Sequence, residues 1–132
     1  QAYRWSKGRA VFASGSPFAP VMYNGTRFVP GQANNVYVFP GIGLGITISR
    51  AKRVSDEMFQ AAARALAAQV TEDDLSLGRV YPPLTQIRNV SAQIATAVAR
   101  TAQNQGLASV HLPENDADLL ADIHNTMYQP PY

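Results

Sequence analysis

The sequence predicts an α/β chain in which a few short strands precede a mostly α-helical region. The first observation behind this prediction is the continuously apolar run at Ala10–Ala13, which is typical of a strand covered on both faces. The second is a pair of short apolar runs on either side of Asn24-Gly25, which predicts a small β-hairpin. The third is the helical spacing of apolar residues from Asn34 onward.

The first part of the chain is predicted to form short elements joined by turns. Residues 1–7 are expected to form a short helix. The strand at 10–13 is expected to end at Ser14-Gly15-Ser16-Pro17, because proline cannot continue a hydrogen-bonded ladder. The hairpin strands are expected at 21–23 and 27–29, since the Asn-Gly pair between them suits a turn whose two central residues need a positive φ.

The second part is predicted to be helical. Asn34 can cap a helix start, and Phe39-Pro40-Gly41 is expected to interrupt the helix that follows. Thr71-Glu72-Asp73-Asp74 has the pattern of a capping box. After this interruption a second helix is expected to run to about residue 51. Further helices are expected at about 55–70, 71–78, 84–106 and 113–128, with a proline-rich tail after them.

Three glycines at every second position, Gly41, Gly43 and Gly45, lie inside a predicted helix. They differ from a dinucleotide-binding fingerprint, which must follow a strand and would need its third glycine where this chain has Ile46. Gly41 and Gly45 are one helical turn apart on one face. We therefore predict that these glycines allow close helix packing.

The composition excludes several classes of function. The chain of 132 residues is 46% hydrophobic with a formal net charge of +2, so there is no electrostatic reason to expect nucleic acid binding. It has no cysteine, which excludes disulfides, thiolate catalysis and cysteine-based metal sites. No apolar run reaches the roughly 20 residues that a membrane span needs. We expect a cytoplasmic protein that binds neither nucleic acid nor a membrane.

Two sequence runs point to a small polar ligand. Residues 30–41 place Asn34 and Asn35 between a Gly-containing turn and an apolar segment, and amide side chains offer donors and acceptors without charge. Residues 8–18 contain the predicted strand and the Ser14–Ser16 loop at its carboxyl end, where open α/β sheets bind ligands. Taken alone, the amide pair is better explained by a helix cap or a turn than by ligand binding.

Together the two runs closely resemble the C-terminal part of malic enzymes, which oxidatively decarboxylate malate to pyruvate with NAD or NADP and a divalent metal. The resemblance implies that residues 1–106 are the C-terminal part of a Rossmann-like NAD(P)-binding domain, with its last strand and a small hairpin, and that 107–132 form a C-terminal helix and tail. It implies that Asn34 binds malate, that Asn35 contacts both substrate and cofactor, and that Ser14, Gly15 and Ser16 lie near the nicotinamide.

The resemblance also implies what this chain does not carry. The family's catalytic Tyr and Lys, its Gly-rich cofactor loop and its Mg²⁺ or Mn²⁺ ligands lie upstream in the family pattern, and no segment here matches them. His111 and His124 have no carboxylate at metal-ligand spacing, and Glu72–Asp74 are better explained as acids at a helix start. The chain begins at Gln1, and we expect it to be an inactive piece of a longer enzyme.

The chain is therefore predicted to form one wall of a malic enzyme site that binds malate and pyruvate. The full-length protein is predicted to be a homo-oligomer. A malolactic enzyme, which shares these motifs and converts malate to lactate, is the alternative within the family. A non-catalytic helical interaction module is the alternative from another class. The isolated chain is expected to self-associate, because its apolar strand has lost the sheet neighbours that the family provides.

Overall fold

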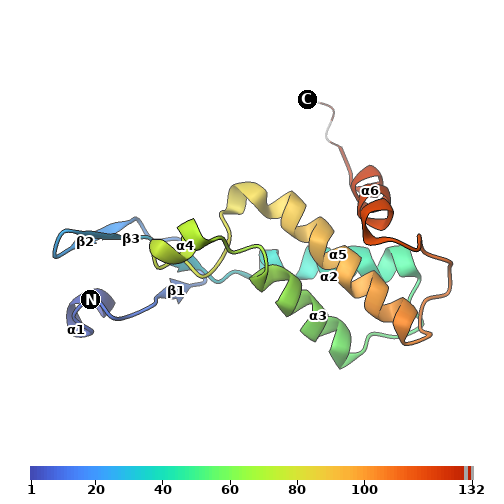
Figure 1. The fold of residues 1–132 in the computed structure, drawn as a ribbon, viewed down its shortest axis with the longest axis horizontal. Helices are drawn as coiled ribbons and strands as arrows, with labels where there is room; N and C mark the ends of the chain where they lie inside the picture. Colours follow the sequence, from blue (N-terminus) through green and yellow to red (C-terminus); the bar gives the residue numbers. More distant parts are fainter. Residues whose placement is uncertain (130, 132) are drawn as a thin grey trace.

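The computed structural model of the protein describes residues 1–129 and 131. It has a small β region at one end and a helical bundle at the other (Figure 1). The β region holds helix α1 (Ala2–Trp5) and strands β1 (Ala13–Ser14), β2 (Val21–Tyr23), β3 (Thr26–Phe28) and β4 (Gly31–Gln32). The predicted α/β class is confirmed, with strands first and helices after them.

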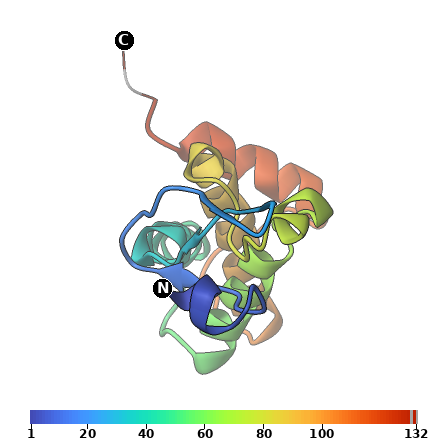
Figure 2. The same cartoon turned by 90° about the vertical axis from the view of Figure 1, so that its left-hand side faces the viewer.

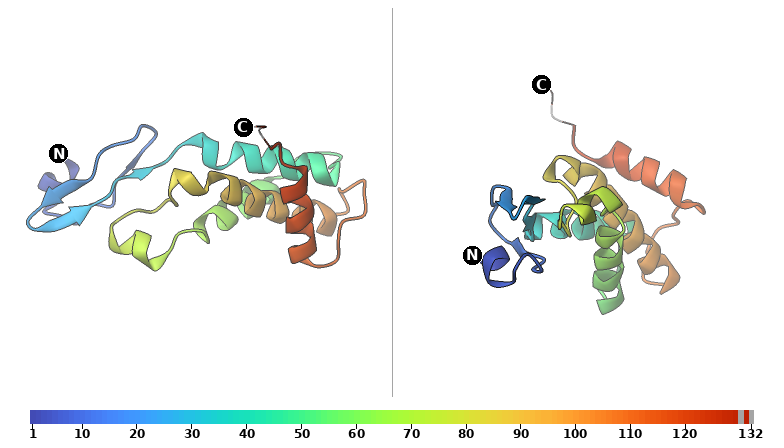
Figure 3. Two further views of the ribbon diagram at one scale, coloured as in Figure 1. Left: turned by 90° about the horizontal axis from the view of Figure 1, so that it is seen from above. Right: turned by 60° about the vertical axis from the view of Figure 1, so that its left-hand side comes forward.

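The helical part is built around one long helix, α5 (Ile87–Asn104). Helices α2 (Phe39–Ser49), α3 (Asp56–Ala67) and α6 (Asp116–Thr126) each pack against α5. Seen from above, the hairpin lies at one end of the elongated molecule and α6 lies toward the other (Figure 3, left). The view from the β end shows α1 and the hairpin in front of the bundle (Figure 2). The remaining elements are η1 (Asn35–Tyr37), α4 (Glu72–Ser76) and η2 (Leu84–Gln86).

The predicted strand at Ala10–Ala13 is wrong in its bounds and its coverage. The strand β1 spans only Ala13–Ser14, and it pairs in parallel with β4, which was not predicted. The ladder starts where the Gly31 N–H donates to the Phe12 carbonyl, because Pro30 before it has no N–H to donate. Val11 is 65% exposed within this chain, so the apolar run is not covered on both faces here.

The hairpin prediction is confirmed. Strands β2 and β3 pair antiparallel, with Val21 opposite Phe28 and Tyr23 opposite Thr26. The turn residues Asn24 and Gly25 have φ values of +49° and +77°. Positive φ at both central positions is what the favoured hairpin turn requires, so the Asn-Gly pair fixes the register of this hairpin.

The glycines of α2 lie against α5, as predicted. A Cβ atom at Gly41 would lie 2.7 Å from the Cβ of Ile94, and one at Gly45 would lie 2.7 Å from the carbonyl oxygen of Ala95. Gly43, on the other side of the helix, has no atom within 4 Å of its Cβ position. Gly41 and Gly45 therefore let the two helices approach more closely than any larger residue would allow.

The other helical predictions hold apart from shifts of a few residues at their ends. Asn34 caps η1, Pro40 lies in the first turn of α2, and the capping box of α4 is present. Pro130 and Tyr132 of the predicted tail lie outside the described residues. Among the residues that the structure describes, no helix is long and apolar enough to cross a membrane.

The carboxylate of Asp74 fastens α4 to the segment that follows it. It accepts hydrogen bonds from the Thr71 N–H at 3.0 Å, from the Thr71 hydroxyl at 2.9 Å and from Arg79 Nε at 2.9 Å. Burial alone would raise the pKa of Asp74, but the Thr71 and Arg79 donors outweigh it and hold this pKa below its ordinary value of 3.8.

We expect Asp74→Ala to lower the free energy of unfolding by roughly 2–4 kcal/mol at neutral pH, because it removes a cap and leaves Arg79 unpaired. The folded-state pKa is depressed, so this stabilisation is present above the ordinary pKa of 3.8 and is lost as the pH falls through the folded-state pKa. Urea unfolding at pH values above and below that pKa measures the stabilisation that the Asp74 carboxylate contributes. Asp73→Ala, at an exposed position beside it, is the control, and equal effects of the two variants would contradict the account.

Candidate functional site

The loop after β1 and the turn before η1 are joined at the carbonyl oxygen of Gly15. The Asn34 Nδ2 donates to this oxygen at 3.2 Å. One step earlier, the Ala33 N–H donates to the Ser14 carbonyl oxygen at 2.8 Å, which extends the β1–β4 ladder. The structure therefore brings together the two segments that the sequence singled out, Ser14–Ser16 and Asn34–Asn35.

Gln32 adds a second donor to the same carbonyl. Its Nε2 lies 3.4 Å from the Gly15 oxygen, longer than the bond from Asn34 and therefore weaker. No sequence pattern singles out Gln32. Its position in β4, directly opposite Ser14 in the parallel register, is what places its amide beside the loop.

The two asparagines differ in how much of their hydrogen-bonding capacity the chain itself uses. Asn34 is half-buried, its Oδ1 accepts from the Val36 N–H at 2.9 Å, and its Nδ2 is bound to Gly15. Asn35 is exposed, and its side chain forms no hydrogen bond within the described residues. Asn34 thus holds the local structure and keeps one N–H and one lone pair for a ligand, whereas all of the Asn35 amide is free to bind one.

Both asparagines line a cavity of about 330 Å³. The remaining wall is mostly apolar and comes from α3 and from the segment after α4. It consists of Ala63, Leu66, Ala67, Val80 and Tyr81. A cavity of this size with two neutral amides on one wall and apolar groups on the other is suited to a small polar molecule that must be held in one orientation.

Tyr37, two residues after Asn35, forms a hydrogen bond to Pro82, which directly follows the cavity residue Tyr81. Its side chain is 1% exposed, and its hydroxyl donates to the Pro82 carbonyl oxygen at 2.5 Å. Burial raises the pKa of the Tyr37 hydroxyl, so it remains a protonated donor. The Tyr37 and Tyr81 rings lie with their centroids 5.5 Å apart.

The polar side chains that line the cavity are two amides and the Tyr81 phenol, which can bind and orient a ligand. The cavity lining has no Asp, Glu, His or Lys. Among the described residues, no three His, Asp or Glu side chains gather into a group that could hold a metal ion. The described residues therefore do not form a Mg²⁺ or Mn²⁺ site by themselves. The Ser14–Ser16 loop, which is exposed from Gly15 onward, has main-chain and hydroxyl groups that fit a polar part of a cofactor.

The other candidate residues lie away from this cavity. His111 and His124 are exposed near α6, and the basic residues Arg50, Lys52 and Arg53 are exposed around the turn between α2 and α3. The acids Glu72 and Asp73 are exposed in the first turn of α4, as expected for acids at a helix start.

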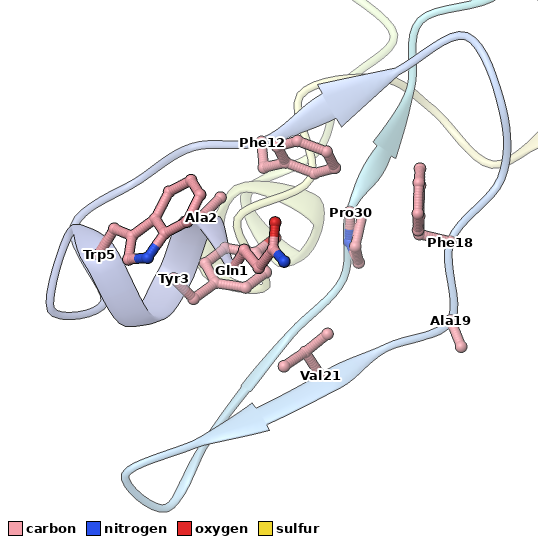
Figure 4. Close-up of a pocket in the computed structure, with 9 residues that line it drawn as sticks. All are labelled: Gln1, Ala2, Tyr3, Trp5, Phe12, Phe18, Ala19, Val21 and Pro30. Carbon is pink, nitrogen blue, oxygen red and sulfur yellow. The ribbon is translucent and has the colours of Figure 1, made fainter.

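A second hollow, of about 480 Å³, lies in the β region and is almost entirely apolar. Figure 4 shows Trp5, Phe12 and Phe18 around it, with Val21 and Pro30. Trp5 is 80% exposed and Phe18 is 56% exposed. It lacks the convergent polar groups that fix the orientation of a small ligand, so we assign it no ligand.

Comparison with known proteins gives consistent matches. The family model described as malic enzyme, NAD binding domain, matches residues 1–103. The whole chain is 58% identical to an NADP-dependent malic enzyme of Phaseolus vulgaris and 55% identical to a chloroplastic NADP-dependent malic enzyme of Zea mays. It covers 22% and 20% of those proteins, so it spans about a fifth of their length.

A solved structure agrees with these matches. The crystal structure of the Entamoeba histolytica malic enzyme superposes with a TM-score of 0.69 at 26% sequence identity. The superposition covers 95% of this chain and 23% of that protein. It therefore includes nearly all of the β region and the helical bundle described above.

Proposed function

Because this chain belongs to the malic enzyme family, we propose that it forms one wall of the malate and cofactor site in a longer malic enzyme. That enzyme would oxidatively decarboxylate malate to pyruvate and CO₂. The relatives named above are NADP-dependent, which favours NADP over NAD as the cofactor. The single observation that carries the proposal is the bond between Asn34 and Gly15, because it joins the proposed substrate and cofactor segments.

In this proposal the residues of the chain bind and orient. Asn34 and Asn35 hold the carboxylate or hydroxyl of malate, and Ser14, Gly15, Ser16 and Asn35 lie along the nicotinamide. When bound, the cofactor accepts the hydride and the divalent metal acts as a Lewis acid. Proton transfer and metal binding are assigned to parts of the longer protein outside this chain, because the cavity lining has no Asp, Glu, His or Lys.

The reaction products decide between the two activities within the family. The full-length protein, incubated with malate, NADP or NAD and Mg²⁺ or Mn²⁺, is expected to form pyruvate and reduced cofactor in equal amounts. Lactate without net cofactor reduction would instead identify the malolactic alternative. Neither product, from a folded full-length protein, would favour the non-catalytic interaction module.

The isolated 132-residue chain is expected not to turn over malate. The reason is that the acid–base groups and metal ligands of the reaction are assigned outside it. The measurement is pyruvate formation by the purified chain with cofactor and metal, run beside the full-length protein at equal concentration. Metal-dependent pyruvate formation by the pure chain would overturn this expectation.

The isolated chain is also expected to self-associate through its β region. Strand β1 pairs only with β4 among the described residues, and the apolar hollow of Figure 4 is lined in part by the exposed side chains of Trp5 and Phe18. Unpaired strand edges and exposed apolar groups both favour association. Light scattering across a dilution series measures it, and a single mass near 14.3 kDa at high concentration would contradict it.

Three further parts of the proposal concern the whole protein. We propose that the full-length enzyme is a homo-oligomer, that it is cytoplasmic, and that residues 1–106 belong to its cofactor-binding domain while 107–132 form the C-terminal helix and tail. Gel filtration with light scattering and cell fractionation test the first two. Limited proteolysis near residue 106 tests the third.

A further inference from the structure

We propose that Tyr37 is a positioning residue that sets the distance between the two walls of the malate cavity. It would do so through its hydrogen bond to Pro82, without touching the substrate. This inference rests on the proposed function, because it assigns Tyr37 a role in the same cavity. Neither the sequence analysis nor the family match gives this residue a role.

The Tyr37 backbone is coupled to the two asparagines by hydrogen bonds. The Tyr37 N–H donates to the Asn34 carbonyl oxygen at 3.1 Å, and the Val38 N–H donates to the Asn35 carbonyl oxygen at 3.1 Å. Tyr37 is the last residue of the η1 turn, which spans Asn35–Tyr37. A displacement of the Tyr37 backbone would therefore be carried to both asparagines.

Pro82 is coupled through the backbone to the part of the cavity wall that Tyr81 forms. Pro82 is fully buried and directly follows Tyr81, which lines the cavity. Two consecutive prolines, Pro82 and Pro83, restrict the backbone here to a narrow range of φ. The position of the Pro82 carbonyl therefore restricts where the Tyr81 backbone can lie.

The hydrogen bond from the Tyr37 hydroxyl to the Pro82 carbonyl oxygen is buried and joins distant parts of the chain. The donor and the acceptor are 45 residues apart, and the Tyr37 hydroxyl is shielded from water. Removing the hydroxyl would leave the buried Pro82 carbonyl without this donor, so we expect the two segments to move apart until water reaches the carbonyl. The ring of Tyr37 would still fill the core, so the main change would be in the width of the cavity.

The test compares Tyr37→Phe with Tyr3→Phe in the full-length protein. Tyr3 is also buried, but it lies in the β region, and its hydroxyl forms no hydrogen bond within the described residues. We expect Tyr37→Phe to raise the KM for malate about 3- to 10-fold with kcat changed less than about twofold. Tyr3→Phe is expected to leave both constants unchanged. A lowered melting temperature with unchanged KM would show a purely structural role and overturn the inference.

A double-mutant cycle with Asn35→Ala asks whether Tyr37 acts through the amides. If it does, Tyr37→Phe will have little further effect on malate KM in the Asn35→Ala background, whereas full additivity would overturn the inference. Should Tyr37→Phe fail to fold, Tyr81→Leu shortens the remaining wall and is expected to raise malate KM in the same way. A KM equal to wild type in Tyr81→Leu would then overturn it.

These outcomes separate the inference from the proposed function. If the wild-type full-length protein does not use malate, the proposed function fails. If the wild type uses malate and Asn35→Ala impairs it, but Tyr37→Phe behaves like Tyr3→Phe, only the role of Tyr37 fails.

Discussion

Replacing Gly45 with alanine is expected to lower the free energy of unfolding of this chain by roughly 2–3 kcal/mol. The added Cβ would lie 2.7 Å from the carbonyl oxygen of Ala95 and 2.8 Å from the Cβ of Val98. Both contacts are too short, and one is with backbone, so α2 and α5 would have to separate along a buried seam. This cost exceeds the gain of about 1 kcal/mol that alanine brings to a helix interior.

Gly43→Ala is the matched control, because it makes the same change in the same helix. Its Cβ position has no neighbour within 4 Å, so only the helix propensity changes. We expect Gly43→Ala to raise the free energy of unfolding by about 0.5–1 kcal/mol. Urea denaturation followed by circular dichroism measures both variants, and equal effects at the two positions would show that the close packing of α2 on α5 does not determine stability.

Asn34→Ala in the full-length protein is expected to reduce kcat/KM for malate by about 10- to 100-fold, since a hydrogen bond to a charged carboxylate contributes roughly 1.5–3 kcal/mol. The structure adds a second cause of loss. Without the Asn34 amide, the Gly15 carbonyl keeps only the longer bond from Gln32, so the proposed cofactor loop is held less firmly. The lost cap should cost only about 1 kcal/mol of stability.

Asn115→Ala is the control for this variant. Asn115 caps α6 just as Asn34 caps η1, with its Oδ1 accepting from the Asp118 N–H at 2.8 Å. It lies outside the residues that line the cavity. We expect the two variants to lose similar stability, while only Asn34→Ala loses malate activity. A melting temperature lowered alike in both, with wild-type kinetics in both, would leave Asn34 as a helix cap and nothing more.

The features predicted correctly from sequence are those decided by neighbouring residues. The hairpin follows from the positive φ values that Asn24 and Gly25 accept, and the α4 cap follows from Thr71 and Asp74 three residues apart. The packing role of Gly41 and Gly45 was also predictable, because their spacing places them on one helix face. In each case the local sequence and the tertiary structure favour the same conformation.

The features that were missed depend on residues far apart in the chain. β4 is too short to leave a pattern, and it forms only because Gly31 and Gln32 come to lie beside β1. The expected strand at Ala10–Ala13 failed for the related reason that Pro30 cannot extend the ladder. The bond from Tyr37 to Pro82 joins segments 45 residues apart, and no sequence spacing indicates such a contact.

Part of the lining of the candidate cavity could be named from the sequence, and part could not. The sequence singled out Asn34, Asn35 and the Ser14–Ser16 loop, and the structure places these two segments in contact. It could not indicate that α3 and Tyr81 form the remaining wall, because those residues are apolar or aromatic and read as ordinary core positions. The difference between the two amides could not be predicted from the sequence either. Asn34 is hydrogen-bonded within the chain, whereas Asn35 is exposed.

A crystal structure of the full-length protein with malate and NADP would show whether the two asparagines bind the substrate. We expect a malate oxygen within about 3.2 Å of the Asn34 or Asn35 amide, with the nicotinamide beside the Ser14–Ser16 loop. Malate bound in a productive position without contact to either asparagine would contradict it.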